Sequence, residues 1–189
     1  MLRASSRPAK SGVVYGITHG GVVFALDSPT GVVRPLGTTW GSGYYATALA
    51  LSDDGVHLYF APFAPGLPIL PPLKDAPIVQ LDTRTGKRSI VALLGPELEQ
   101  NYGYEIDQNY GVTVDDKEGR LYLTFNGRLK STGVEAPCFV VLSTRAVNST
   151  SGQLTASDAN VKEINPAYHR ATSAHSTVSV SSTDPHSLR

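Results

Sequence analysis

The chain has 189 residues, and its 16 basic and 16 acidic side chains give a formal net charge of zero. Neutrality removes the long-range attraction that a nucleic-acid-binding surface normally needs, so we expect no nucleic-acid partner. The single cysteine, Cys138, excludes an internal disulfide framework and any Cys-x-x-Cys motif. The 18 glycines and 13 prolines favour many turns and few long helices.

The chain shows no pattern of targeting or membrane insertion. Its first ten residues include basic side chains but no apolar run behind them, unlike a secretory signal peptide. The longest apolar runs, such as 46–51, are far shorter than the ~20 residues of a membrane helix. We therefore expect no membrane span, and the compartment stays open, with the cytoplasm as the default.

Short apolar, β-branched and aromatic runs alternate with Gly, Pro, Asp and Asn turns across most of the chain. Such runs predict antiparallel strands. We expect strands at 13–18, 22–27, 32–36, 46–51, 57–61, 77–82, 88–93, 110–114, 120–125 and 138–143. On the early strands we expect Val14, Ile17, Phe24 and Leu26 to be buried.

The strand pattern repeats. Leu26-Asp27-Ser28-Pro29-Thr30-Gly31 returns as Leu81-Asp82-Thr83-Arg84-Thr85-Gly86, and the strand around Tyr59 returns around Tyr122. Each unit is a four-stranded meander joined by turns. A single four-stranded sheet buries neither face alone, so such units must stack against their neighbours, as the blades of a propeller do.

Two segments carry a family resemblance. Gly-Val-Thr-Val-Asp-Asp-Lys-Glu-Gly-Arg-Leu-Tyr-Leu-Thr at 111–124 and Val-Gln-Leu-Asp-Thr-Arg-Thr-Gly-Lys at 79–87 resemble the NHL, gluconolactonase-like and strictosidine-synthase-like six-bladed β-propellers. The resemblance covers about 130 residues. It implies a β-propeller, and with the strand pattern and the composition we expect an all-β fold of antiparallel four-stranded meander blades, an incomplete β-propeller with disordered ends.

The composition divides the chain into three parts. We expect a disordered N-terminal segment at 1–11, a partial β-propeller at 12–145, and a Ser/Thr-rich, mostly disordered tail at 146–189. The propeller part has about two and a half blades, fewer than the ~4–8 that close a ring. The segments 62–77 and 95–109 are expected to be inserted loops. We interpret the chain as a fragment, with self-association through open blade faces as an alternative.

Tyrosines gather before the expected inner strands. Tyr44 and Tyr45 precede one of them, and Tyr104 and Tyr110 precede another. Aromatic loops at a propeller mouth can bind a protein or small-molecule ligand, although they can equally cap the blade ends. This pattern indicates a binding or scaffold module that acts through its blade-end loops, with no catalytic residues assigned.

The family resemblance implies a second possibility, a calcium site. In lactonase-like propellers a Pro-Asn-Gly at this place supplies an Asn oxygen to calcium. Here Asn109 matches the Asn, Gln108 replaces the proline, and Tyr110 is inserted before the glycine. Calcium takes six to eight oxygens, which Glu105 and Asp107 could help to supply. The alternatives are a fragment of a calcium-dependent lactonase- or esterase-like hydrolase, or a polar loop without a metal.

Two acid pairs, Asp53-Asp54 and Asp115-Asp116, recur just before a glycine. Paired carboxylates can perform acid–base chemistry when they are desolvated. A recurring place in a hairpin turn is better explained by Asp side chains that accept hydrogen bonds from the backbone. We therefore interpret both pairs, and also Asp27 and Asp82, as parts of turns.

Overall fold

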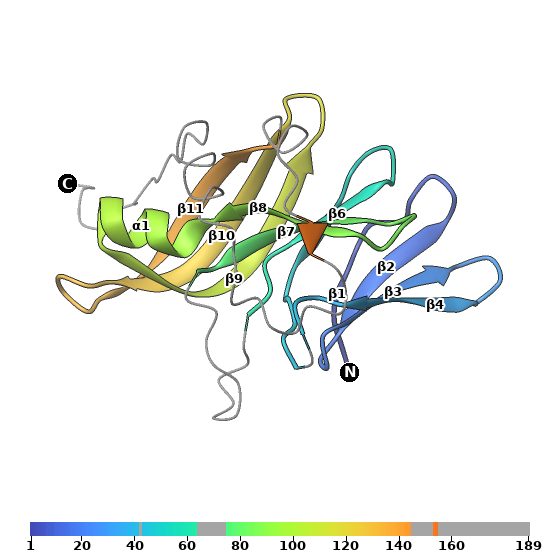
Figure 1. The fold of residues 1–189 in the computed structure, drawn as a ribbon, viewed down its shortest axis with the longest axis horizontal. Helices are drawn as coiled ribbons and strands as arrows, with labels where there is room; N and C mark the ends of the chain where they lie inside the picture. The colour runs from blue at the N-terminus through green and yellow to red at the C-terminus, as the bar shows by residue number, and fades with distance from the viewer. Residues whose placement is uncertain (42, 64–74, 145–152, 155–189) are drawn as a thin grey trace, which may run out of the picture.

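The computed structural model describes residues 1–41, 43–63, 75–144 and 153–154. Its strands form three antiparallel sheets, which lie side by side (Figure 1). The only helix in the described part of the chain is short, and that part includes no helix long and apolar enough to span a membrane. The fold is therefore all-β.

The first sheet is a meander of four strands, which we call blade 1. Its strands, in spatial and chain order, are β1 (Leu2–Ser5), β2 (Val13–Thr18), β3 (Val22–Asp27) and β4 (Val33–Thr38). The turn between β2 and β3 requires a glycine at Gly21, where φ is 81°. A Cβ at this position would also lie 1.9 Å from the carbonyl oxygen of Tyr44.

The second sheet, blade 2, repeats the same meander. Its strands are β5 (Leu49–Leu51), β6 (His57–Phe60), β7 (Pro77–Asp82) and β8 (Arg88–Leu93). A two-residue strand, β12 (Gln153–Leu154), pairs with the outer edge of β8. Blade 2 thus has five strands in the order β12-β8-β7-β6-β5.

A helix connects blade 2 to the third sheet, blade 3. The helix α1 (Leu94–Tyr102) follows β8 directly and ends at Gly103, whose left-handed φ of 62° lets its amide bond to Glu99 and Leu98 carbonyls. Blade 3 has the strands β9 (Tyr104–Asp115), β10 (Arg120–Leu129) and β11 (Glu135–Ser143). They pair in the order β11-β10-β9.

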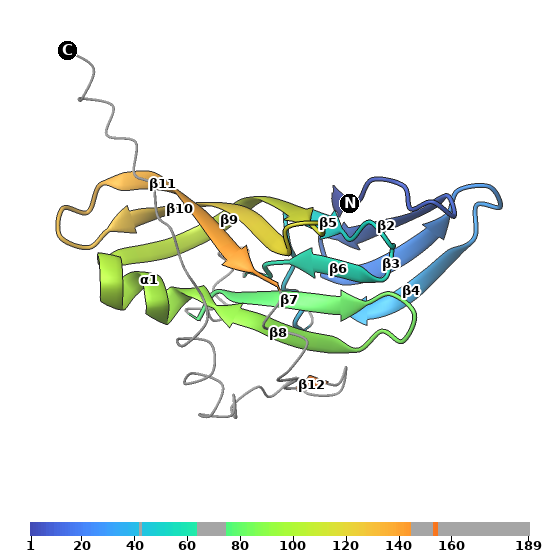
Figure 2. The same cartoon turned by 90° about the horizontal axis from the view of Figure 1, so that it is seen from above.

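The hydrophobic core lies between the blades. One buried cluster joins blades 1 and 2 and includes Ile17, Val23, Leu58 and Leu81. The other joins blades 2 and 3 and includes Tyr59, Ile78, Leu121 and Leu142. Figures 1 and 2 show blade 2 between blade 1 and blade 3. The blades stack face to face without closing a ring, so the described fold is an incomplete β-propeller.

All ten expected strands are present, but three expectations about the fold are wrong. The first concerns the segment 1–11, which was expected to be disordered. Leu2–Ser5 instead forms β1, the inner strand of blade 1, and pairs with β2. Its four residues are too few to show an alternation, and they are stabilised by pairing with the inner edge of β2 and by burial of Ala4.

The second concerns 95–109, which is not a loop but contains most of α1 and the first half of β9. Gly95 and Pro96 favour a turn in the sequence. Pro96 nevertheless lies in the first turn of the helix, where its missing N–H has no intrahelical partner to lose. Leu94 and Leu98, four residues apart, lie on one helix face and are 1% and 0% exposed.

The third concerns the side of blade 1 that is buried. Val14, Phe24 and Leu26 are only partly buried, whereas Val23 and Ala25 are buried. Blade 1 is at one end of the stack, so only one of its faces meets another blade. The Pro-rich segment 64–74 and the tail lie outside the described residues, except for β12.

Candidate functional site on the loop face

Three connections meet at one end of blades 1 and 2. They are the β2–β3 turn (19–21), the residues before β5 (39–41 and 43–48) and the residues after β6 (61–63), and we call this surface the loop face. The Thr39 amide donates to the Gly21 carbonyl over 2.8 Å. Tyr45 and Phe63 form a β-bridge. The loop face is thus held together by backbone hydrogen bonds between segments far apart in sequence.

Three side chains surround the ring of Tyr45 on this face. The Tyr45 ring lies 5.1 Å from the His19 ring and 4.6 Å from the Phe63 ring, measured between centroids. The guanidinium carbon of Arg3 lies 4.6 Å from the Tyr45 centroid, a cation–π contact. We call Arg3, His19, Tyr45 and Phe63 the Tyr45 cluster. Tyr45 itself is only 6% exposed, and the more exposed side chains of the cluster pack against its ring.

Arg3 determines how the His19 ring presents its nitrogens. Arg3 Nε donates to His19 Nδ1 over 3.0 Å, and Nη2 lies 2.9 Å from the same atom. Because a guanidinium has no acceptor, Nδ1 must accept, and a neutral His19 carries its proton on Nε2. His19 is exposed. The cluster therefore offers a cation, an imidazole and aromatic rings together, which suits a carboxylate beside an apolar group.

The loop face also holds Tyr44, one of the expected ligand-binding residues. Tyr44 is partly buried, and burial raises the pKa of its hydroxyl. Its carbonyl accepts a hydrogen bond from the Thr39 hydroxyl and lies over Gly21. Tyr44 and Tyr45 therefore share one surface, and the backbone of Tyr44 holds it in place.

The other two expected tyrosines lie elsewhere. Tyr104 was expected on a loop, but it begins β9, is 4% exposed and packs in the core between blades 2 and 3. Its hydroxyl donates to the Ala136 carbonyl over 2.5 Å, and burial raises its pKa. Tyr110 is 58% exposed, and its hydroxyl lies 3.2 Å from Gln108 Oε1. The four tyrosines do not form one site.

The expected calcium ligands are all on β9. Asn109 is 2% exposed, and its Nδ2 donates to the carbonyls of Gly111 and Thr124 over 2.9 and 3.0 Å. Its Oδ1 is buried and accepts no hydrogen bond from the described residues. Glu105 forms an ion pair with Arg128 over 2.7 Å.

Asp107, the third expected ligand, is exposed on the same strand. The described part of the chain contains no group of three or more His, Cys, Asp and Glu side chains that could hold a metal ion. The buried Asn109 oxygen is the one feature of β9 that points to a cation.

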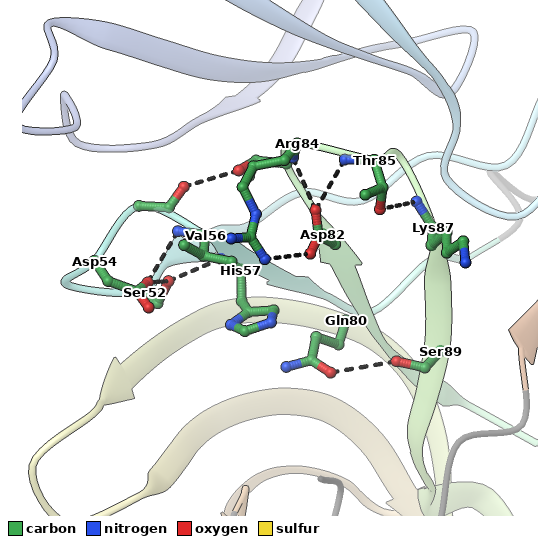
Figure 3. Close-up of polar contacts among 12 residues, drawn as sticks. Ser52, Asp54, Val56, His57, Gln80, Asp82, Arg84, Thr85, Lys87 and Ser89 are labelled. Carbon is green, nitrogen blue, oxygen red and sulfur yellow. Dashed lines mark hydrogen bonds and ion pairs between the residues drawn. The ribbon is translucent and has the colours of Figure 1, made fainter.

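Asp54 and Asp82 hold turns in blade 2, at the opposite end from the loop face (Figure 3). Asp54 Oδ1 accepts from Ser52 Oγ over 2.6 Å and from the Val56 amide over 2.9 Å. Asp82 Oδ1 accepts from the Arg84 and Thr85 amides, both over 2.9 Å. The turn interpretation of these acids is confirmed.

The same turns connect the three blades. Arg7, between β1 and β2, forms an ion pair with Asp53 and donates to the Leu51 carbonyl over 3.1 Å. The Asp53 amide donates to the Asp116 carboxylate. Asp53 and Asp116 occupy equivalent positions in successive blades. The polar groups at this end therefore serve the architecture.

Sequence analysis missed Arg3, His19 and Phe63. Arg3 lies in a segment expected to be disordered, and His19 is a turn residue with no motif around it. Only the pairing of β1 with β2 brings Arg3 to His19, sixteen residues away. The bridge to Tyr45 similarly places Phe63. No local sequence pattern predicts contacts between residues so far apart in the chain.

Comparison with known proteins gives similarity of structure alone. No protein-family model matches the chain, and no curated protein matches it. Eighty chains of solved structures match. One is a structural genomics protein of unknown function from Bacteroides thetaiotaomicron VPI-5482, with a TM-score of 0.45 and 12% identity over 71% of this chain. Another is the tricorn protease, with a TM-score of 0.46 and 12% identity over 74% of this chain. This chain covers 30% and 13% of those proteins, respectively.

Proposed function

We propose that this chain is a β-propeller-type binding module that takes its partner at the loop face, through the Tyr45 cluster. The observation that carries the proposal is the cation–π contact of Arg3 with Tyr45, beside the exposed His19 ring. A charged group, an imidazole and aromatic rings in one place are the ordinary means of recognising a polar group next to an apolar one.

The chemistry of the cluster defines the class of partner. Arg3 and His19 can donate hydrogen bonds to a carboxylate, and Phe63 provides an aromatic ring beside them. We therefore expect the partner to be a peptide segment with a carboxylate next to an apolar side chain. The described acids Asp54 and Asp82 are engaged in turns at the other end, which favours binding over acid–base catalysis.

A peptide library displayed on phage tests this function. The wild-type chain is the target, and selected peptides are then measured against Arg3→Ala and Tyr45→Phe variants. Arg3→Ala should weaken binding by at least about tenfold, since it removes the cation. Tyr45→Phe keeps the ring and should retain most of the affinity. Tyr110→Ala, an exposed tyrosine on β9 that is not a member of the Tyr45 cluster, is the matched control.

Two results would contradict the proposal. One is a library that yields no peptide with a measurable affinity for the wild-type chain. The other is a set of peptides whose affinity falls equally in Arg3→Ala and Tyr110→Ala, because that would place the binding surface elsewhere.

We infer a second candidate function, a calcium-dependent propeller hydrolase of which this chain supplies a part. The buried Asn109 Oδ1, which accepts no hydrogen bond from the described residues, supports it. If calcium binds near Asn109, calcium but not an equal concentration of magnesium should raise the unfolding temperature. Asp107→Asn should reduce that increase while leaving the buried Asn109 in place. An unfolding temperature that calcium does not change would rule out the calcium site. It would not affect the proposal of peptide binding at the loop face.

A further inference from the structure

The two internal interfaces of the stack have the same construction. Each blade has a face that carries a tyrosine on its second strand, namely Tyr15, Tyr59 or Tyr122, and we call it the tyrosine face. The opposite face, which we call the leucine face, carries the apolar residue preceding that tyrosine: Val14, Leu58 or Leu121. In both internal interfaces the tyrosine face of one blade packs on the leucine face of the next.

Burial of the equivalent residues shows how complete these interfaces are. On the tyrosine faces, Tyr15 is 7% exposed and Tyr59 is 4% exposed. On the leucine faces, Leu58 and Leu121 are both fully buried. A partner blade therefore covers each of these positions almost completely.

In the described part of the chain no blade covers the tyrosine face of blade 3, which carries Tyr122 and Phe139 together with the exposed Arg120 and Thr124. Tyr122 is partly exposed, and Phe139 is 38% exposed, although the equivalent Ile78 of blade 2 is fully buried. The two rings stack with centroids 6.1 Å apart and planes 22° apart. The residues opposite Tyr122 on the adjacent strands, Thr113 and Val141, are uncharged.

At the other end of the stack, no sheet of the described residues packs on the leucine face of blade 1. Leu26 pairs with Val14 on one side and Val33 on the other, so the three residues share this face. Val33 is 58% exposed, whereas Leu81, the repeat equivalent of Leu26, is fully buried in blade 2. Gly16 has no side chain, so the Phe24 ring packs directly over its backbone. The Phe24 ring therefore covers part of the sheet on this face.

We propose that a second copy of this chain covers these faces head to tail, with the leucine face of its blade 1 on the tyrosine face of blade 3. The contact would continue the interface that occurs twice within the chain. Exposed apolar surfaces of this kind mark interaction sites. Two copies contribute six blades, which lies within the ~4–8 that close a propeller. A head-to-tail contact that closes yields a finite ring of two copies instead of a filament.

The test is the mass of the full chain in solution, measured by light scattering and sedimentation at micromolar concentrations. The wild-type chain should be a dimer. Val33→Asp blocks only the leucine face of blade 1, and Phe139→Asp blocks only the tyrosine face of blade 3. Each substitution should weaken self-association by at least about tenfold, because it buries a charge in an apolar contact. Both residues are exposed, so the fold should persist, as circular dichroism can verify.

Mixing the two variants gives the decisive result. Each variant retains the face that the other has lost, so an equimolar mixture should form a one-to-one dimer through a single contact. Val134→Asp is the matched control, since Val134 is 57% exposed in the β10–β11 turn, outside both faces. It should leave the wild-type dimer unchanged.

Several outcomes would overturn the inference. A wild-type monomer at these concentrations would show that the faces do not associate. A dimer that persists in Val33→Asp or in Phe139→Asp alone would indicate like-on-like contact. Aggregates that neither substitution disperses would indicate nonspecific association. None of these substitutions is in the Tyr45 cluster, so peptide binding at the loop face is tested independently.

Discussion

Arg88 in β8 donates a hydrogen bond from Nη2 to the carbonyl oxygen of Leu36 in β4 over 3.0 Å. Its Nη1 donates to the Gly86 carbonyl, also over 3.0 Å. Arg88 is 6% exposed, and burial lowers the pKa of its guanidinium. Gly37 leaves the necessary space, because a Cβ there would lie 2.9 Å from Nη2. A buried cation thus ties the outer strands of blades 1 and 2 together.

We expect Arg88→Ala to lower the free energy of unfolding by about 2–3 kcal/mol, because it leaves buried carbonyls without their charged donor. Arg88→Met should cost less, since its side chain refills much of the space without a buried charge. Urea denaturation measures both. Arg84→Ala, in the adjoining turn, removes an ion pair whose arginine side chain is 69% exposed, and it should destabilise the fold much less than Arg88→Ala because solvent screens exposed ion pairs. Equal losses in Arg88→Ala and Arg84→Ala would contradict this account.

Asp82 should make the stability of the chain depend on acid pH. Burial works to raise the pKa of its carboxyl, but hydrogen bonds from the Arg84 side chain and the Thr85 and Arg84 amides lower it to about 2. A depressed pKa stabilises the fold fully above the ordinary value of 3.8. That contribution is lost as the pH falls towards about 2.

The measurement for Asp82 is the difference in unfolding free energy between the wild-type chain and Asp82→Asn, followed from pH 7 downward. The difference should be constant above the ordinary pKa and shrink below it. Arg84→Ala should narrow the pH range over which this difference falls. It removes the side-chain donor to Asp82 and leaves the two amides, so the pKa of Asp82 is lowered less. A difference that is independent of pH throughout would refute the role of Asp82.

Replacement of Gly127 and of Gly16 by alanine should destabilise the fold to different extents. A Cβ on Gly127 would lie 2.2 Å from the backbone carbonyl oxygen of Glu105, so the β9–β10 pairing itself must shift. A Cβ on Gly16 would lie 2.4 Å from Phe24 Cζ, the far end of a partly exposed side chain that can rotate away. We expect Gly127→Ala to cost about 1–3 kcal/mol, measured by urea denaturation, and Gly16→Ala to cost clearly less. The reverse order would show that the Phe24 ring is fixed over blade 1.

Much of the architecture could be predicted because its signals are local. The strands from β2 to β8 follow from apolar runs of a few residues, and the turns follow from Asp and Gly at fixed offsets. The hydrogen bonds to the Asp82 carboxylate, for example, come from Arg84 and Thr85, within three positions. The turn interpretation of Asp54, Asp82 and Asp115 succeeded for the same reason, whereas Asp53 and Asp116 bond to residues of other blades.

The candidate site could not be predicted in the same way. Tyr44 and Tyr45 were correctly placed on a loop, but their relation to Arg3 and His19 depends on the pairing of β1 with β2. Tyr104 looks like a loop residue only if the helix α1 is missed. Its neighbours Gly103 and Tyr102 give no local sign that its ring enters the core.

The sequence by itself determined most of the strands and turns, but not β1 or the first half of β9, because alternation and turn chemistry act over a few residues. Only the tertiary structure decided which face of each blade is buried. Both faces are apolar along most strands, so the order of stacking makes Val23 core and leaves Phe24 partly exposed. The stacking also brings Arg3, His19, Tyr45 and Phe63 together, since contacts between distant strands depend on the packing of whole sheets and not on local sequence.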